Sequence, residues 1–160
     1  MEDHLKSRPK KVPFKLSKQR ELRKTAIHLV KNRLLPHQKI IKIILIGSSV
    51  KGNFGKYKSP GFRGSLYSDF DFIVFVDSYY KIPKWLKREL NGKPFADDKL
   101  NLAYRNKKLI DNKFDIEVFF VRKSSMKNPK IKKLGELAGI PMSKNSKHKH
   151  LVVYSRACLE

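Results

Sequence analysis

Cysteine, acidic side chains and long apolar runs are all scarce in this sequence of 160 residues. Its one cysteine, Cys158, cannot form a disulfide within the chain, and the absence of a Cys/His cluster at metal-ligand spacing argues against zinc. The longest apolar run, Phe72–Val76, is far too short to span a bilayer. The lysine-rich start, interrupted by Pro13, lacks the apolar stretch of a secretory signal. We therefore expect a cytoplasmic protein that makes no use of a membrane.

The shortage of acids leaves a large positive charge. Against 37 Lys and Arg residues there are 14 Asp and Glu, a formal net charge of +23. Such a field attracts polyanions and releases their counterions on contact, which favours nucleic acid as a partner. A content of 40% hydrophobic and 11% aromatic residues is enough to bury a core and argues against wholesale disorder. Genome bias or a hot habitat also produces lysine-rich chains. The net charge therefore indicates a class of partner but does not indicate a reaction.

The distribution of charge, glycine and proline predicts three parts. Residues 1–16 are basic and lack periodicity, which predicts a loosely held N-terminal arm. Residues 17–142 are predicted to form one domain, interrupted by a mobile, glycine-rich basic insertion at 50–68. Residues 143–160 are predicted to form a basic C-terminal tail, although Leu151–Tyr154 within it is apolar.

Hydrophobic periodicity predicts one α/β (α+β) domain. An amphipathic helix is expected from Ser17 until Pro36. The segments expected to be strands are Lys39–Ile46, Asp69–Val76 and Phe114–Val121, and short helices are expected at Pro83–Leu90 and Asn128–Leu137. Residues 97–110 are ambiguous: we adopt a helix, with the start of a hairpin as the alternative.

Paired carboxylates open the second expected strand. Asp69 and Asp71 are two residues apart, so on a strand their side chains point to the same side. Two like charges repel, and a divalent cation such as Mg²⁺ or Mn²⁺ would offset that repulsion. A third carboxylate from a neighbouring strand would complete a two-metal site. Taken alone, an Asp-x-Asp pair is more simply a solvated strand start.

A Gly-Ser pair follows the first expected strand. Gly47 allows the backbone to approach a phosphate closely, and the Ser48 hydroxyl can donate a hydrogen bond to it. A third motif, Phe-Asp-Ile-Glu, opens the third expected strand. Because the three motifs occur in this order on successive strands, a purely structural role for each of them becomes less plausible. The runs are IGSSVKG (Ile46–Gly52), SDFDFIVFV (Ser68–Val76) and FDIEVFF (Phe114–Phe120).

This combination resembles the polymerase-beta-type nucleotidyltransferase superfamily, in its minimal stand-alone form, over residues 39–121. The resemblance implies the nucleotidyltransferase fold, with a small mixed β-sheet and helices packed on one side, and assigns roles residue by residue. It implies nucleotide binding by Gly47, Ser48, Ser49 and Lys51, and catalysis and metal binding by Asp69, Asp71 and Asp115. Glu117 lies on the same face as Asp115 and is the alternative third carboxylate if the register shifts by two. One departure is the stretch of 20 residues from Ser49 to Ser68 between the Gly-Ser pair and the first Asp, which is longer than is usual for the family.

The implied reaction moves a nucleoside monophosphate from a nucleoside triphosphate such as ATP to a hydroxyl acceptor, with Mg²⁺ or Mn²⁺ as cofactor. Basic residues interleaved with Tyr57, Phe62 and Tyr67 favour RNA or DNA as the acceptor. Two alternatives remain: a toxin-neutralising enzyme that modifies a partner protein, and a non-catalytic basic RNA-binding module of the same fold. An enzyme would need metal and triphosphate, whereas the binding module would ignore both.

Overall fold

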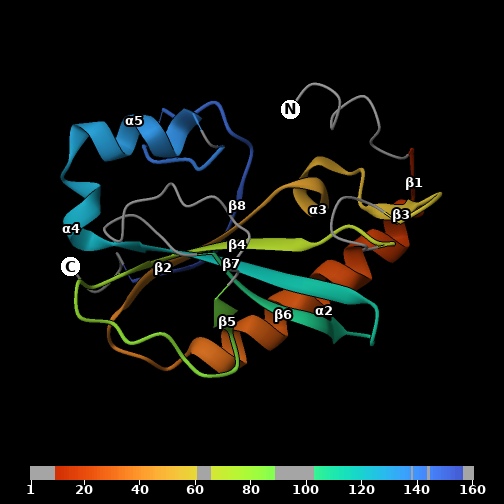
Figure 1. The fold of residues 1–160 in the computed structure, drawn as a ribbon, viewed down its shortest axis with the longest axis horizontal. Helices are drawn as coiled ribbons and strands as arrows, with labels where there is room; N and C mark the ends of the chain where they lie inside the picture. The colour runs from red at the N-terminus through yellow and green to blue at the C-terminus, as the bar shows by residue number, and fades with distance from the viewer. Residues whose placement is uncertain (1–9, 61–65, 89–102, 138, 144, 157–160) are drawn as a thin grey trace.

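The computed structural model describes residues 10–60, 66–88, 103–137, 139–143 and 145–156. They form a mixed α+β structure (Figure 1). Its elements in chain order are β1 (Lys11–Pro13), α2 (Leu16–Leu34), β2 (Ile40–Ile46), α3 (Ser48–Lys51), β3 (Gly55–Tyr57), β4 (Phe70–Val76), β5 (Lys87–Arg88), β6 (Ala103–Ile110), β7 (Phe114–Arg122), α4 (Lys123–Met126), α5 (Pro129–Leu137) and β8 (Leu151–Ser155). A six-stranded mixed sheet has the order β5-β6-β7-β4-β2-β8, and β1 pairs separately with β3.

The three expected strands lie together in the middle of the large sheet. Strand β4 runs parallel to β7 on one side and antiparallel to β2 on the other. The apolar residues of β4 are buried on both faces, because Phe72 belongs to one core cluster and Ile73 to the other. The predictions of strands at these three places are confirmed to within about two residues.

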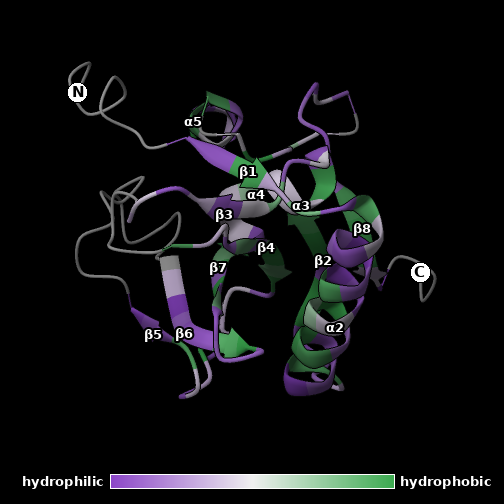
Figure 2. Cartoon of the chain, turned by 90° about the vertical axis from the view of Figure 1, so that its right-hand side faces the viewer, coloured by the Kyte–Doolittle hydropathy of each residue, from purple (hydrophilic) through white to green (hydrophobic). Residues whose placement is uncertain are grey.

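Helix α2 covers one face of the sheet. Ala26, Val30 and Leu34 recur at a spacing of four, are at most 3% exposed, and join the larger core cluster. Figure 2 shows that hydrophilic residues share this helix with hydrophobic ones. The helix ends before Pro36, because a residue that precedes proline favours an extended backbone, and Leu35 has φ −102° and ψ 152°. The predicted amphipathic helix is confirmed. In the described part of the chain, no helix has the length and apolarity needed to cross a membrane.

The prediction that helices pack on one side of the sheet is wrong. Ile131 of α5 packs against Ile44 and Ile73 on the face opposite α2, and Figure 1 shows α2 and α5 on opposite sides of the sheet. The reason is that β2 and β4 carry apolar side chains on both faces. Each face must then be covered to keep these side chains out of water.

Two segments that we predict as helices are not helical where the structure describes them. The described part of residues 97–110 is β6, which forms a hairpin with β7 through a turn at residues 111–113, so the hairpin alternative is the correct one. Asp111 and Asn112 adopt positive φ there, a backbone state that these residue types tolerate. The predicted helix at Pro83–Leu90 is also wrong in its described part, because β5 forms backbone bonds with β6 instead. Residues 89–102 lie outside the described residues.

The arm, the insertion and the tail are all part of the fold where they are described. Strand β1 pairs with β3, and the Phe14 N–H donates to the Phe54 carbonyl at 2.9 Å. Phe54 is fully buried and stacks on Phe70 with ring centroids 4.4 Å apart. In the tail, β8 adds an edge strand beside β2. The expectation of a loosely held arm and a mobile insertion is therefore incorrect for these residues, because burial of Phe54 ties them to the core. Phe62 and Arg63 lie outside the described residues.

The buried Phe54 makes the insertion a stability determinant. We expect Phe54→Ala to lower the free energy of unfolding by about 3–5 kcal/mol, because it removes a fully buried ring that contacts Phe70 and Phe114. Urea denaturation followed by circular dichroism measures this change. The matched control is Tyr79→Ala, whose ring is 83% exposed and should change stability by no more than about 0.5 kcal/mol. Equal small effects of both substitutions would show that the insertion is only loosely attached.

Candidate functional site

Four carboxylates share one face of the central sheet. On β4, Phe70 and Phe72 face α2, so Asp71 between them points to the opposite face. Asp71 and Glu117 are register partners in the parallel pair of β4 and β7, which places them side by side. Asp115 precedes Glu117 by two residues and takes the same face. The sheet thus brings together acids that are 46 positions apart in the sequence.

Three of these acids are close enough to share an ion. Asp69, Asp71 and Glu117 each offer one carboxylate oxygen, and these oxygens lie within 4.8 Å of one another. All three side chains are partly buried, with Asp69 25% and Glu117 14% exposed. Ligands on opposite sides of an octahedral Mg²⁺ are about 4.2 Å apart, so a small inward shift of the side chains would close this set around the ion. Carboxylate oxygens also suit Mn²⁺. The residues present fit a divalent cation of this hard type.

The structure places Asp115 outside this group of three. One of its oxygens accepts the Lys108 backbone N–H at 2.8 Å and the other accepts from Arg105 at 3.0 Å. The physical reason is the register of the sheet: Glu117 lies opposite Asp71, and a step of two residues moves Asp115 about 7 Å along the strand. Asp115 was the predicted third carboxylate. The geometry instead brings Glu117, the alternative, to Asp69 and Asp71.

Arg105 is a residue of the site that the sequence reasoning missed. It is 6% exposed, and its Nη1 donates at 3.0 Å to Asp69 and at 3.0 Å to Asp115. Its Nη2 donates to Glu117, its register partner across β6 and β7. The guanidinium offsets part of the repulsion among the carboxylates, which burial would otherwise make costly. Adopting the hairpin for residues 97–110 would have revealed it, because the hairpin register sets Arg105 opposite Glu117.

Gly47 touches the acidic cluster directly. Its φ is +82°, and a Cβ at this position would lie 2.7 Å from the Asp71 Oδ2. Both the backbone conformation and the lack of space therefore require glycine. Gly47 immediately precedes α3, so the predicted Gly-Ser motif and the second Asp-x-Asp carboxylate, Asp71, are neighbours in space as well.

The other predicted nucleotide-binding residues differ in accessibility. Ser48 is half-buried and Lys51 is exposed, so both are open to a ligand at this end of the sheet. Ser49 is only 3% exposed, and its carbonyl accepts from Arg23 Nη1 at 3.2 Å. Its hydroxyl makes no hydrogen bond within the part of the chain that the structure describes. Burial makes Ser49 the least accessible of the four predicted residues.

Comparison with known proteins adds no assignment. No protein-family model and no curated protein matches this chain. The geometry of the site is therefore the basis for its chemistry: a cluster of acids on neighbouring strands that could hold a cation, next to a glycine whose lack of a side chain lets Asp71 lie against the backbone. An arrangement of this kind suits reactions of phosphate esters, in which metal-held oxygens and phosphates meet.

Substitutions of the acids separate the two candidates for the third ligand. We expect Asp71→Asn and Glu117→Gln to weaken Mn²⁺ binding about tenfold or more, because each removes a charged ligand oxygen. Asp115→Asn should have a much smaller effect, because Asp115 contacts Arg105 and Lys108 rather than the shared centre. Mn²⁺ titration followed by electron paramagnetic resonance measures the affinities. Asp111→Asn, on the exposed turn, is the control, and equal losses for Asp115→Asn and Glu117→Gln would contradict the assignment.

A methyl group at position 47 tests the close approach of the backbone to Asp71. We expect Gly47→Ala to reduce Mn²⁺ affinity and to destabilise the fold by about 1–3 kcal/mol, because it combines a positive φ with a clash. Gly139→Ala is a matched control, since Gly139 has φ +89° and nothing within 4 Å of the added Cβ. Gly139→Ala should lower the free energy of unfolding through its positive φ and should keep normal Mn²⁺ affinity. Loss of Mn²⁺ affinity in both variants would mean that strain alone, and not the contact with Asp71, is responsible.

Proposed function

We propose that this protein is a metal-dependent nucleotidyltransferase that moves a nucleoside monophosphate from a nucleoside triphosphate to a hydroxyl acceptor. The observation that carries the proposal is the convergence of Asp69, Asp71 and Glu117 within 4.8 Å beside Gly47. The motifs that resemble the polymerase-beta-type superfamily in the sequence supply these same residues, with Glu117 in place of Asp115. In the reaction, the acceptor oxygen forms a bond to the α-phosphorus, and the bond from that phosphorus to the departing pyrophosphate breaks.

The chain's own residues position the reactants. Strands β4 and β7 hold Asp71 and Glu117 at fixed spacing, and Arg105 orients Asp69 and Glu117 through ion pairs. The bare backbone at Gly47 leaves room for the Asp71 carboxylate. The Ser48 hydroxyl and the Lys51 ammonium, on the short helix that follows, are accessible to a triphosphate. A partly buried, preorganised site of this kind stabilises developing charge better than water does. Divalent cations held by the carboxylates would supply charge neutralisation for the acceptor and leaving oxygens.

Nucleic acid is the favoured acceptor. Strand β3 brings the exposed side chain of Lys56 next to the segment that leads into Asp69, through the bridge between Lys56 and Tyr67. The Lys56 ammonium lies 5.9 Å from the centre of the Tyr67 ring, and the Lys11 ammonium lies 5.6 Å from that of Tyr57. Lysines for phosphate contact and aromatic rings for base stacking are the two components of single-strand binding surfaces. The net charge of +23 also favours nucleic acid, because it attracts the phosphate backbone.

Label transfer tests both the reaction and the acceptor. The protein is incubated with each α-³²P-labelled triphosphate, Mg²⁺, and RNA, DNA or protein acceptors, and the products are separated by size. We expect label on RNA, with a loss of about 100-fold or more in Asp71→Asn and Glu117→Gln, because each removes a charge that would hold the metal. Asp111→Asn should retain full activity. Label on protein would identify a protein-modifying enzyme, and full activity in Asp71→Asn would overturn the assignment of the site.

One observation favours a second candidate, a non-catalytic RNA-binding module. Arg105 already pairs with Asp69, Asp115 and Glu117, so the acids have a positive partner of their own without metal. Fluorescence anisotropy with a labelled RNA oligonucleotide separates the candidates. The module would bind RNA equally well with and without a chelator and would ignore triphosphate, whereas the enzyme would bind triphosphate only when Mg²⁺ is present.

A further inference from the structure

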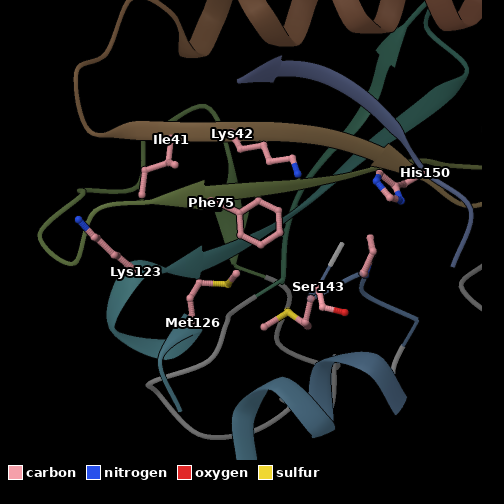
Figure 3. A pocket seen from close by; sticks show the side chains of 9 residues that line it. Ile41, Lys42, Phe75, Lys123, Met126, Ser143 and His150 are labelled. Atoms are coloured by element: carbon pink, nitrogen blue, oxygen red, sulfur yellow. The ribbon is translucent and has the colours of Figure 1, made fainter. Parts of the chain in front are cut away.

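A pocket of about 540 Å³ lies on the same face of the sheet as the acidic cluster, toward the other end of β4 (Figure 3). Segments far apart in the sequence form it: β2, the end of β4, α4, and the chain before β8. Its volume is in the range of small-molecule sites. The residues that line it are Ile41, Lys42, Phe75, Lys123, Met126, Pro141, Met142, Ser143 and His150.

The pocket is separate from the acidic cluster. Phe75 follows Asp71 by four residues, which corresponds to about 13 Å along a strand. Between them on this face, Ile73 is fully buried and Ile44 on β2 is 1% exposed, and the two are register partners in the same core cluster. A ligand in the pocket would therefore lie beyond a packed apolar layer from the carboxylates.

The inner wall of the pocket is apolar and partly aromatic. Figure 3 shows the Phe75 ring at its centre, with Ile41 and Lys42 on one side and Met126 on the other. Met126 and Met142 place flexible, polarizable thioethers opposite the strands. A flat ring system stacks on phenylalanine and contacts thioether sulfur favourably. The wall is thus suited to a planar aromatic body.

The polar groups of the pocket are basic or neutral. The Lys42 ammonium lies 6.0 Å from the centre of the Phe75 ring, and the exposed Lys123 and half-buried His150 lie elsewhere on the wall. None of the described lining residues is acidic. Lysine stems can extend along an apolar surface and keep the ammonium available to an anion. A ligand with a negative group next to its ring would match this combination.

We propose that this pocket binds a small ligand made of a planar aromatic body and an anionic group. The inference is independent of the nucleotidyltransferase proposal, because it uses none of the acidic residues. Two kinds of molecule share this chemistry, aromatic carboxylates and nucleoside monophosphates. The ring would pack against Phe75 and the methionines, and the anion would pair with Lys42 on one side of the Phe75 ring or with Lys123 on the other (Figure 3).

Anilinonaphthalene sulfonate, a fluorescent aromatic anion, is the probe. It is titrated with the full chain in the presence of a chelator, so that no metal at the acidic cluster contributes. We expect saturable binding that weakens about tenfold in Lys42→Gln/Lys123→Gln, because the ion pairs are lost. The control pair is Lys127→Gln/Lys130→Gln, which makes the same change in net charge at exposed lysines outside the pocket lining. Circular dichroism confirms that each variant is folded.

A second variant tests the cavity itself. Ser143→Trp, from an exposed position on the lining, should fill the space and abolish saturable binding while net charge stays the same. Displacement of the probe by benzoate or by adenosine monophosphate then shows whether the pocket binds aromatic carboxylates or nucleoside monophosphates. Wild-type affinity in both the double lysine variant and Ser143→Trp would overturn the proposal. Failure of both competitors to displace the probe would contradict the proposed ligand class.

Discussion

The burial of β4 on both faces is the constraint on which the rest of the structure depends. Phe72 and Val74 face α2, whereas Ile73 and Phe75 face the opposite core cluster, and all four are at most 6% exposed. A strand of this kind cannot lie at an edge, so β2 and β7 flank it and a helix must cover each face. Charged residues on it are tolerable only near its ends. The acidic cluster lies at the beginning of β4 for this reason, and Asp71 is the one carboxylate within the strand itself.

Arg105 is what makes the cluster compatible with folding. Several partly buried carboxylates near one another would repel and would lose hydration. The guanidinium compensates Asp69, Asp115 and Glu117 through the planar geometry that arginine provides. It also fixes β6 against β7, because Arg105 and Glu117 are register partners. Asp69, Asp71 and Glu117 also lie close enough to one another that they could hold a cation.

The sequence reasoning succeeded where a single local pattern determined the element. The β-branched runs were sufficient to predict β2, β4 and β7. The four-residue spacing of apolar residues was sufficient to predict helix α2, and the Asp-x-Asp spacing predicted that the side chains of Asp69 and Asp71 lie close together. It failed where partners distant in the sequence decide. Residues 103–110 pair with β7, and Phe54 fills a space against Phe70, neither of which local composition reveals. The choice between Asp115 and Glu117 depended on the register of β4 against β7, which only the assembled sheet defines.

The positive charge of this protein would therefore affect anion binding differently at the two proposed sites. At the acidic cluster Arg105 is already paired with carboxylates, so a phosphate anion would approach through bound cations or through neighbouring basic groups such as Lys51. At the pocket beside Phe75, lysines face an apolar wall with no acid among its described lining residues, so an anion can bind directly. The two proposals consequently differ in the response to a chelator that they predict: removal of divalent cations should abolish triphosphate binding at the first site and leave aromatic anion binding at the second unchanged. If the net charge of +23 produced only nonspecific attraction of anions, a chelator would cause no such difference between the two sites.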